Sequence, residues 1–280
     1  MEKAIKRSFP IFVLPTMIAF TLGFIIPFAE GVYLSFCKFT TVNDAKFIGL
    51  SNYAKVFKDS TFVHAFWYTA AFTVVSVILI NVLAFAVALL LTKGIKGTNV
   101  FRTVFFMPNL IGGIVLGYIW QLLLNGILMK FSRTLTYSST FGFWGLVILM
   151  CWQQIGYMMI IYIAGIQNIP GELIEAAEID GATKRQVLKS VTIPMVMPSI
   201  TVCTFLTLTN SFKLFDQNLA LTNGEPSKMS EMLALNIFTT FYGRAGYEGV
   251  GQAKAVIFFI LVAAIALTQN YLTRRKEVQQ

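Results

Sequence analysis

The chain has 280 residues, of which 56% are hydrophobic and only 12% are charged. Soluble domains carry about 25% charged residues, so this composition excludes a soluble globular protein and indicates an integral membrane protein. The net charge of +9 does not indicate nucleic-acid binding, because the basic residues form short clusters beside apolar segments, as membrane anchoring requires.

Six segments are long enough to cross a membrane, for which a helix needs about 20 apolar residues. Each span must satisfy its own backbone hydrogen bonds, which favours helices, and the runs are too continuous for the alternating strands of a β-barrel. In chain order the predicted spans are residues 9–29, 65–92, 103–129, 142–168, a segment within 190–212, and 255–273. We therefore predict an all-α membrane protein with six transmembrane helices.

The segments around the spans carry local signals. Pro108 and the pair Gly112-Gly113 predict a kink or close packing in the third span, and the GxxxG spacing of Gly113 and Gly117 indicates a helix-packing face. The run 47–57 predicts a short interfacial helix in the first long loop. The run 221–226 predicts a turn, after which we expect a helix beginning near Ser227.

The distribution of Lys and Arg predicts the orientation. With the N-terminus in the cytoplasm, the inner segments 1–8, 93–102, 171–190 and 274–280 hold 12 Lys or Arg in 45 residues, whereas the outer segments hold 10 in 90. Positive charge accumulates on the cytoplasmic side of membrane proteins. We therefore expect both termini in the cytoplasm.

The most polar stretch lies between the fourth and fifth spans. Residues 134–171 carry no charge, whereas residues 172–189 carry seven. Pro170 can start a helix, Glu172 and Glu175 favour its N-terminus, and Gly181 permits a turn with positive φ.

A second short helix is predicted directly after that turn. Residues 183–186, Thr-Lys-Arg-Gln, fit a capping box. The whole element could rest on the bilayer surface, but its acidic first half does not suit an anionic leaflet. A docking helix for a cytoplasmic partner fits the pattern better.

This element resembles the EAA signature of permease subunits in binding-protein-dependent ABC importers. The signature is carried by Glu175-Ala176-Ala177, by Gly181 after three intervening residues, and by Val191-Thr192-Ile193-Pro194, where the family usually has Ile and Leu at the two apolar positions. The run from Ile169 to Thr183 resembles the sugar-uptake branch. The runs 49–53, 105–109, 119–120, 212–216 and 221–226 also resemble that branch, although Glu225 replaces a common Gly. The long N-terminal span resembles the first permease of a heteromeric pair.

The resemblance implies a type I importer permease fold. It divides the chain into an N-terminal helix with an outer loop (1–65), a five-helix core transmembrane domain (66–273) that contains the coupling element 171–190, and a short tail (274–280). It implies that the EAA helix docks in a cleft of an ATP-hydrolysing subunit. The implied coupling residues are Glu172, Glu175, Ala176, Ala177, Asp180 and Gly181.

The chain itself has no GxxxxGK[ST] phosphate loop, so we expect no cofactor in it, ATP and Mg²⁺ being bound by the partner ATPase. The implied partners are an ATPase dimer, a second homologous permease, an extracellular solute-binding protein, a sugar and membrane lipid. Cys37, Cys151 and Cys203 are far apart and His64 is the single histidine, so we expect neither a metal site nor a catalytic role.

Polar side chains within spans are the candidates for the substrate path. They are Asn81, Asn109, Gln121, Gln153, Gln154, Asn210 and Ser211. About half of these are expected to bond only to neighbouring helices. Sugars are bound by planar polar groups and aromatic faces, which favours Trp152, Gln153, Tyr157, Asn210, Ser211 and Phe215.

Other functions remain as alternatives. A permease for another solute, such as a glycerol phosphate or a polyamine, would also carry the EAA signature. Lys213 is the one cationic candidate for binding a phosphorylated substrate, and pairing with Asp216 is the alternative role for it. An intramembrane enzyme would need a catalytic group such as HExxH, which is missing from the sequence. A secondary transporter is disfavoured because we find no inverted repeat and no acidic residue within a span.

Overall fold

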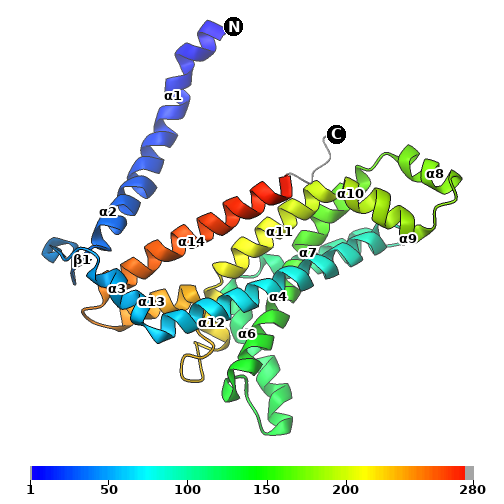
Figure 1. Ribbon diagram of the computed structural model, residues 1–280. Helices are drawn as coiled ribbons and strands as arrows, with labels where there is room; N and C mark the ends of the chain where they lie inside the picture. The colour runs from blue at the N-terminus through cyan, green and yellow to red at the C-terminus, as the bar shows by residue number, and fades with distance from the viewer. Residues whose placement is uncertain (1, 275–280) are drawn as a thin grey trace. The chain divides into compact units, whose positions relative to one another are not determined.

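The computed structural model describes residues 2–274, and these are mostly helical (Figure 1). Among them, five helical segments are long and apolar enough to cross a membrane. They are Phe12–Leu34, Ser60–Leu91, Gly113–Phe131, Ser139–Gln167 and Glu248–Gln269. A bent pair, Lys184–Met195 with Met197–Phe212, meets at 68° and makes a sixth span if counted as one. The prediction of six spans is confirmed on that count.

The third predicted span is broken rather than kinked. Helix α5 (Thr98–Phe106) ends in the 3₁₀ turn η3 (Met107–Leu110), and helix α6 (Gly113–Leu128) begins anew after Gly112, whose ψ of 140° is extended. Pro108 lacks a backbone N–H and cannot continue an α-helical ladder. The start predicted at residue 103 therefore belongs to α5, and the long apolar helix begins ten residues later.

The fold contains two compact units. The first comprises the described residues up to Ser60 together with Ile237–Ile260. It contains α1 (Glu2–Phe20), the π-helical turn η1 (Thr21–Ile25), α2 (Ile26–Leu34), β1 (Cys37–Lys38), η2 (Val42–Asp44), β2 (Lys46–Phe47) and α3 (Ser51–Lys58). The strands pair antiparallel with Cys37 opposite Phe47. Helix α3 confirms the short helix expected in this loop.

Side chains fix the loop that holds these elements. The buried Asn52 on α3 donates hydrogen bonds to the carbonyls of Ser35, at 2.9 Å, and Cys37, at 2.8 Å. The carboxylate of Asp44 accepts from the backbone N–H groups of Thr40 and Thr41, both at 3.0 Å, and these bonds hold the pKa of Asp44 below its usual value. The loop is therefore a folded structure.

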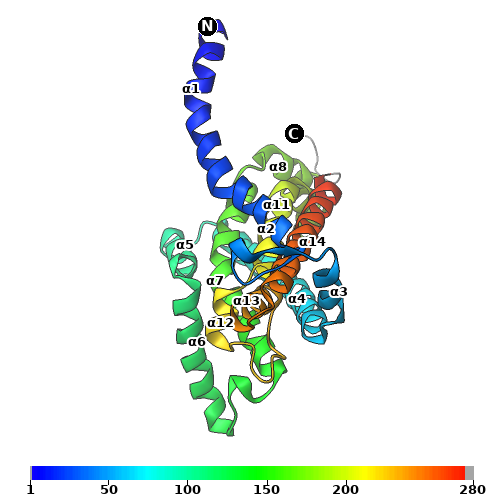
Figure 2. The ribbon, with the colours of Figure 1, turned by 90° about the vertical axis from the view of Figure 1, so that its left-hand side faces the viewer.

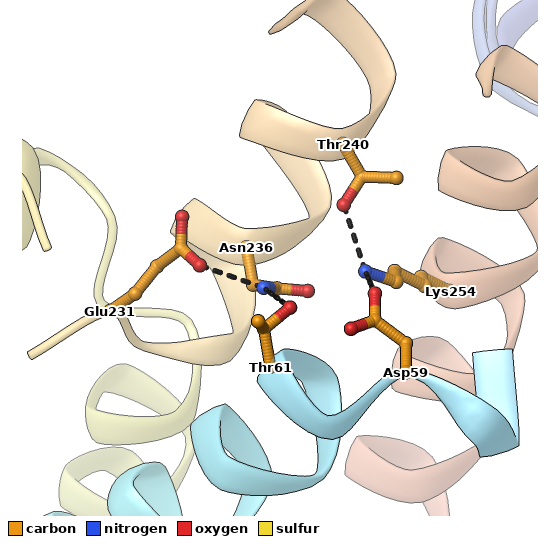
Figure 3. Close-up of polar contacts among 6 residues, drawn as sticks. All are labelled: Asp59, Thr61, Glu231, Asn236, Thr240 and Lys254. Carbon is orange, nitrogen blue, oxygen red and sulfur yellow. Dashed lines mark hydrogen bonds and ion pairs between the residues drawn. The ribbon is translucent and has the colours of Figure 1, made fainter. Parts of the chain in front are cut away.

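A buried ion pair also lies in this unit. Helix α14 (Glu248–Arg274) carries Lys254, whose ammonium lies 2.8 Å from a carboxylate oxygen of Asp59 and 2.8 Å from the hydroxyl of Thr240 on α13 (Leu233–Gly243) (Figure 3). Lys254 is fully buried and Asp59 is 19% exposed. Breaking such a pair by removing one partner is costly, because a charge stays behind in a poorly solvated place.

The second unit comprises Thr61–Asn236 and the described residues from Leu261 onward. Its helices and turns include α4 (Ser60–Leu91), α5, η3, α6, η4 (Met129–Phe131), η5 (Leu135–Tyr137), α7 (Ser139–Gln167), α8 (Gly171–Ile179), α9 (Lys184–Val187), the π-helical turn η6 (Leu188–Thr192), α10 (Ile193–Met195), α11 (Met197–Phe212) and α12 (Asp216–Leu221). Buried side chains of α4, α7 and α11 form its core, among them Phe72, Met158 and Cys203.

Three polar side chains, one from each core helix, form a hydrogen-bonded chain. The hydroxyl of Tyr162 on α7 donates to Asn81 on α4 at 2.7 Å, and Asn81 donates to Thr207 on α11 at 3.4 Å. Helix α5 lies against α7 (Figure 2), and the carbonyl of Phe105 occupies the place where a Cβ of Gly156 would stand. Glycine at that position is what lets the two helices touch.

The loop after α12 differs from its prediction. The turn expected at residues 221–226 is present, but no helix begins near Ser227, and α13 starts at Leu233. The buried side chain of Asn218 holds the intervening backbone, donating to the carbonyl of Ser230 at 2.8 Å and accepting from the N–H of Met232 at 2.9 Å. These bonds keep the segment out of a helical ladder. Of the tail predicted at 274–280, residues 275–280 lie outside the described residues.

Candidate functional site

The charged element between α7 and α11 is a pair of short helices that project from the second unit (Figure 1). Helix α8 begins directly after Pro170, whose ψ of 127° is extended, so that the proline precedes the first turn instead of standing in it. Ile174 packs against the hydrophobic core. Leu173 and Ile179 remain 43% and 86% exposed, and α8 buries none of its residues. A helix anchored on one side and apolar on an open side is suited to docking.

The end of α8 is fixed by a glycine motif. Gly181 has a φ of +80° and donates to the carbonyl of Glu178 at 3.0 Å, and the next N–H, of Ala182, donates to the carbonyl of Ala177 at 3.0 Å. These two bonds are a Schellman motif, which satisfies the last carbonyls of a helix. The prediction of a positive φ at Gly181 is confirmed.

The start of α9 is fixed by the predicted capping box. The Gln186 side chain accepts from the N–H of Thr183 at 2.7 Å, and the Thr183 hydroxyl accepts from the N–H of Gln186 at 3.4 Å. Only Asp180, Gly181 and Ala182 separate the C-terminal end of α8 from this cap. Both helix ends at the turn are therefore satisfied from within the element, which fixes the turn between them.

The six predicted coupling residues lie together on this element. Glu172, Glu175, Ala176, Asp180 and Gly181 are exposed and Ala177 is half-buried. The acidic side chains can accept charge-assisted hydrogen bonds from Arg or Lys of a partner. No atom of the described residues lies within 4 Å of a Cβ placed on Gly181, so the surface there is open to close approach.

A second candidate site is a polar cavity of about 290 Å³ at the end of α11. Eight residues line it, namely Met150, Gln154, Asn210, Lys213, Leu214, Phe215, Asp216 and Gln217. The Asn210 amide donates to the Gln154 side chain at 3.2 Å, so that two amides from α7 and α11 meet at the wall. Amide groups beside an aromatic ring are able to bind the hydroxyls and the apolar face of a sugar.

The cavity contains some of the predicted substrate-path residues but not others. Asn210 and Phe215 line it. Gln153 is not part of the lining, but its side chain accepts a hydrogen bond, at 2.8 Å, from the lining residue Gln217. Trp152 packs edge-on against Trp120, with ring centroids 5.6 Å apart, and Tyr157 packs against Phe106 at 6.3 Å.

The remaining polar candidates lie outside the cavity lining. Ser211 is fully buried and is outside the cavity lining. Asn81 bonds to neighbouring helices, as described above, and Gln121 donates to the carbonyl of Leu221 at 3.0 Å. Asn81 and Gln121 therefore join neighbouring helices, as expected of part of the candidates.

Gln217 is not among the substrate-path residues predicted from the sequence, because it lies in none of the predicted spans. It stands on α12, which packs on α6 where Gly113 and Gly117 leave room: Cβ atoms placed on these glycines would lie 2.8 Å from the Asp216 Cβ and 2.5 Å from the Ala220 Cβ. The packing face predicted from the GxxxG spacing is therefore confirmed. This packing brings Gln217 to the cavity wall. The only feature of the sequence that could have indicated Gln217 is the polar run that follows the fifth span.

Comparison with known proteins agrees with this architecture. Residues 80–278 match the family model described as binding-protein-dependent transport system inner membrane component. The chain is 43% identical over 278 residues to the probable starch degradation products transport system permease protein of Thermoanaerobacterium thermosulfurigenes, covering 96% of this chain and 94% of that protein. It is 29% identical to the multiple sugar-binding transport system permease protein of Streptococcus mutans, with 95% of both chains covered.

A solved structure shares the fold. A chain in the crystal structure of a bacterial ABC transporter involved in the import of the acidic polysaccharide alginate matches with a TM-score of 0.82, over 98% of both chains, at 21% sequence identity. At that identity the likeness concerns the fold alone. It supports the type I permease fold predicted from the sequence.

Proposed function

We propose that this chain, which belongs to the family of binding-protein-dependent transport system inner membrane components, forms half of the pore of an ATP-driven oligosaccharide importer. It is a multi-pass membrane protein and a pore component. The observation that carries the sugar assignment is the 43% identity to a permease named for starch degradation products. The cavity agrees with a neutral substrate, since Lys213 and Asp216 both line it and their formal charges cancel.

The energy for transport comes, in this proposal, from a separate ATPase pair that binds ATP and Mg²⁺. Glu172, Glu175, Ala176, Ala177, Asp180 and Gly181 form the surface that docks on it. The support is the geometry of α8, which is exposed, closed by a Schellman motif and followed by a capped helix. Such a rigid element transmits a displacement as a unit. A second homologous permease and an extracellular solute-binding protein complete the importer, and both termini lie in the cytoplasm.

The substrate is tested by ATP hydrolysis. The chain, its partner permease, the ATPase and the solute-binding protein are purified together in lipid nanodiscs. We expect short glucose oligosaccharides to stimulate ATP hydrolysis several-fold over the rate without substrate. Stimulation by glycerol 3-phosphate or putrescine, with none by oligosaccharides, would instead favour the alternative of a permease for another solute.

The cavity is tested by removing two of its three amides, those of Asn210 and Gln154. Asn210→Leu combined with Gln154→Leu should lower the rate of sugar uptake about tenfold, because one or two hydrogen bonds to the sugar, worth about 1 kcal/mol each, are lost. Uptake is measured with radiolabelled sugar in proteoliposomes. Gln121→Leu is the matched control, since that amide bonds to Leu221 outside the cavity. Equal losses in both variants would mean that the cavity amides only support the fold.

A further inference from the structure

The turn between α4 and α5 carries positive charge that nothing nearby in the sequence balances. Lys93 and Lys96 stand in this turn and are exposed, and Arg102 follows one turn into α5. The sequence contains no Asp or Glu from residue 60 to residue 171. Within the part of the chain that the structure describes, none of these three side chains has an ion-pair partner.

Arg102 has a further unused group. Its Nε atom is buried and has no hydrogen-bond partner among the described residues. The guanidinium group presents several donors in one plane, an arrangement that suits the oxygens of a phosphate.

One face of α5 is apolar and open. Val100 is 67% exposed, Phe101 47% and Val104 55%. On its other side the helix is fixed to α7, where the Phe105 carbonyl fills the space at Gly156 and the Phe106 ring packs on Tyr157. Basic residues at one end of an anchored helix and an apolar face along it are typical of a segment at the membrane interface.

The end of α4 agrees with that position. Helix α4 is a membrane-spanning helix that ends at Leu91, and Lys93 and Lys96 follow it within five residues. The two lysines therefore stand where a span leaves the membrane, which is the level of the phosphate headgroups.

We propose that Lys93, Lys96 and Arg102 bind the phosphate headgroup of an anionic phospholipid of the inner leaflet, whose acyl chains cover Val100, Phe101 and Val104. A protein partner suits this surface less well, because lysine is depleted in protein interfaces. Basic residues near an anionic leaflet each contribute about 1 kcal/mol, or about fivefold in affinity. This inference does not depend on which solute is transported.

The test measures lipid binding to the complete complex. Complexes carrying Lys93→Gln with Lys96→Gln are titrated with phosphatidylglycerol and phosphatidylcholine, and bound lipid is counted by native mass spectrometry. We expect the affinity for phosphatidylglycerol to fall about 25-fold and that for phosphatidylcholine to stay unchanged. Lys55→Gln with Lys130→Gln is the matched control, because it removes two exposed lysines elsewhere and should leave both affinities unchanged.

A photo-activatable phosphatidylglycerol locates the site independently. Adducts are expected on the peptide 93–105 in the wild-type complex and should be lost in the lysine variant. Membrane orientation of the variant is checked by protease access to an N-terminal tag. Adducts only elsewhere, equal affinities in variant and control, or cross-linking of a Phe101→Cys variant to the partner permease would each overturn the proposal.

Discussion

Replacing Gly181 by valine is expected to abolish both sugar uptake and the ATP hydrolysis that accompanies it. Gly181 has a φ of +80°, a conformation that a β-branched residue adopts only with strain. Valine would therefore break the Schellman motif that closes α8 and free the turn before α9. A displaced turn cannot hold α8 in the position that docking requires. Uptake into proteoliposomes and sugar-stimulated ATP hydrolysis measure the loss.

Two further variants distinguish the effect of backbone strain at Gly181 from the effect of bulk added to the docking surface. Gly181→Asn keeps the left-handed conformation, which asparagine tolerates, but adds bulk where the chain itself leaves open space. If the asparagine variant also loses transport, a partner must approach closely at this position. Gly171→Ala is the matched control, because it changes the glycine that begins α8, whose added Cβ also meets no atom. It should transport normally.

The negative charge of α8 allows a second test of docking on the ATPase. Glu175→Lys reverses a side chain that is exposed and makes no ion pair in the described part of the chain. Its effect on the isolated chain should be small, whereas a charge-assisted bond to a partner would be lost and replaced by repulsion. Normal transport in both the Gly181→Val and Glu175→Lys variants would contradict docking. It would favour a helix that only rests on the bilayer.

The local features of the element could be predicted from sequence because they depend on few residues. The capping box needs only Thr183 and Gln186, and the turn needs a glycine at position 181. The spans were predictable because twenty apolar residues leave a chain few options in lipid. The break at residues 107–112 could be predicted only in part from the sequence. Pro108 signals an interruption, but whether a helix bends or stops there depends on its neighbours.

The cavity depends on contacts between helices, which the hydrophobic periodicity of the sequence does not predict. Gln217 reaches it only because α12 packs on the two glycines of α6, and Trp152 avoids it because it packs on Trp120. The late start of α13 has a similar cause, since Asn218 binds the backbone of a segment twelve to fourteen residues further along. In each case a tertiary contact overrides the local preference of the chain.

The largest expected effect on stability is at the buried ion pair of the first unit. Lys254→Met removes the ammonium that faces Asp59 and Thr240 (Figure 3). Asp59→Leu removes the carboxylate that balances a fully buried lysine. Each change alone should lower the free energy of unfolding by about 3–5 kcal/mol, because it leaves one charge in a place that water reaches poorly.

The two changes together should cost much less than their sum, since no charge of the pair then remains and apolar side chains fill similar space. The measurement is the unfolding of the purified complex for the wild type, both single variants and the combined variant. Lys55→Met, at an exposed lysine of α3 in the same unit, should change stability by at most about 0.5 kcal/mol. Additive losses would show that Lys254 and Asp59 act separately, each through its other neighbours, and that their 2.8 Å contact contributes little to holding α14 in this unit.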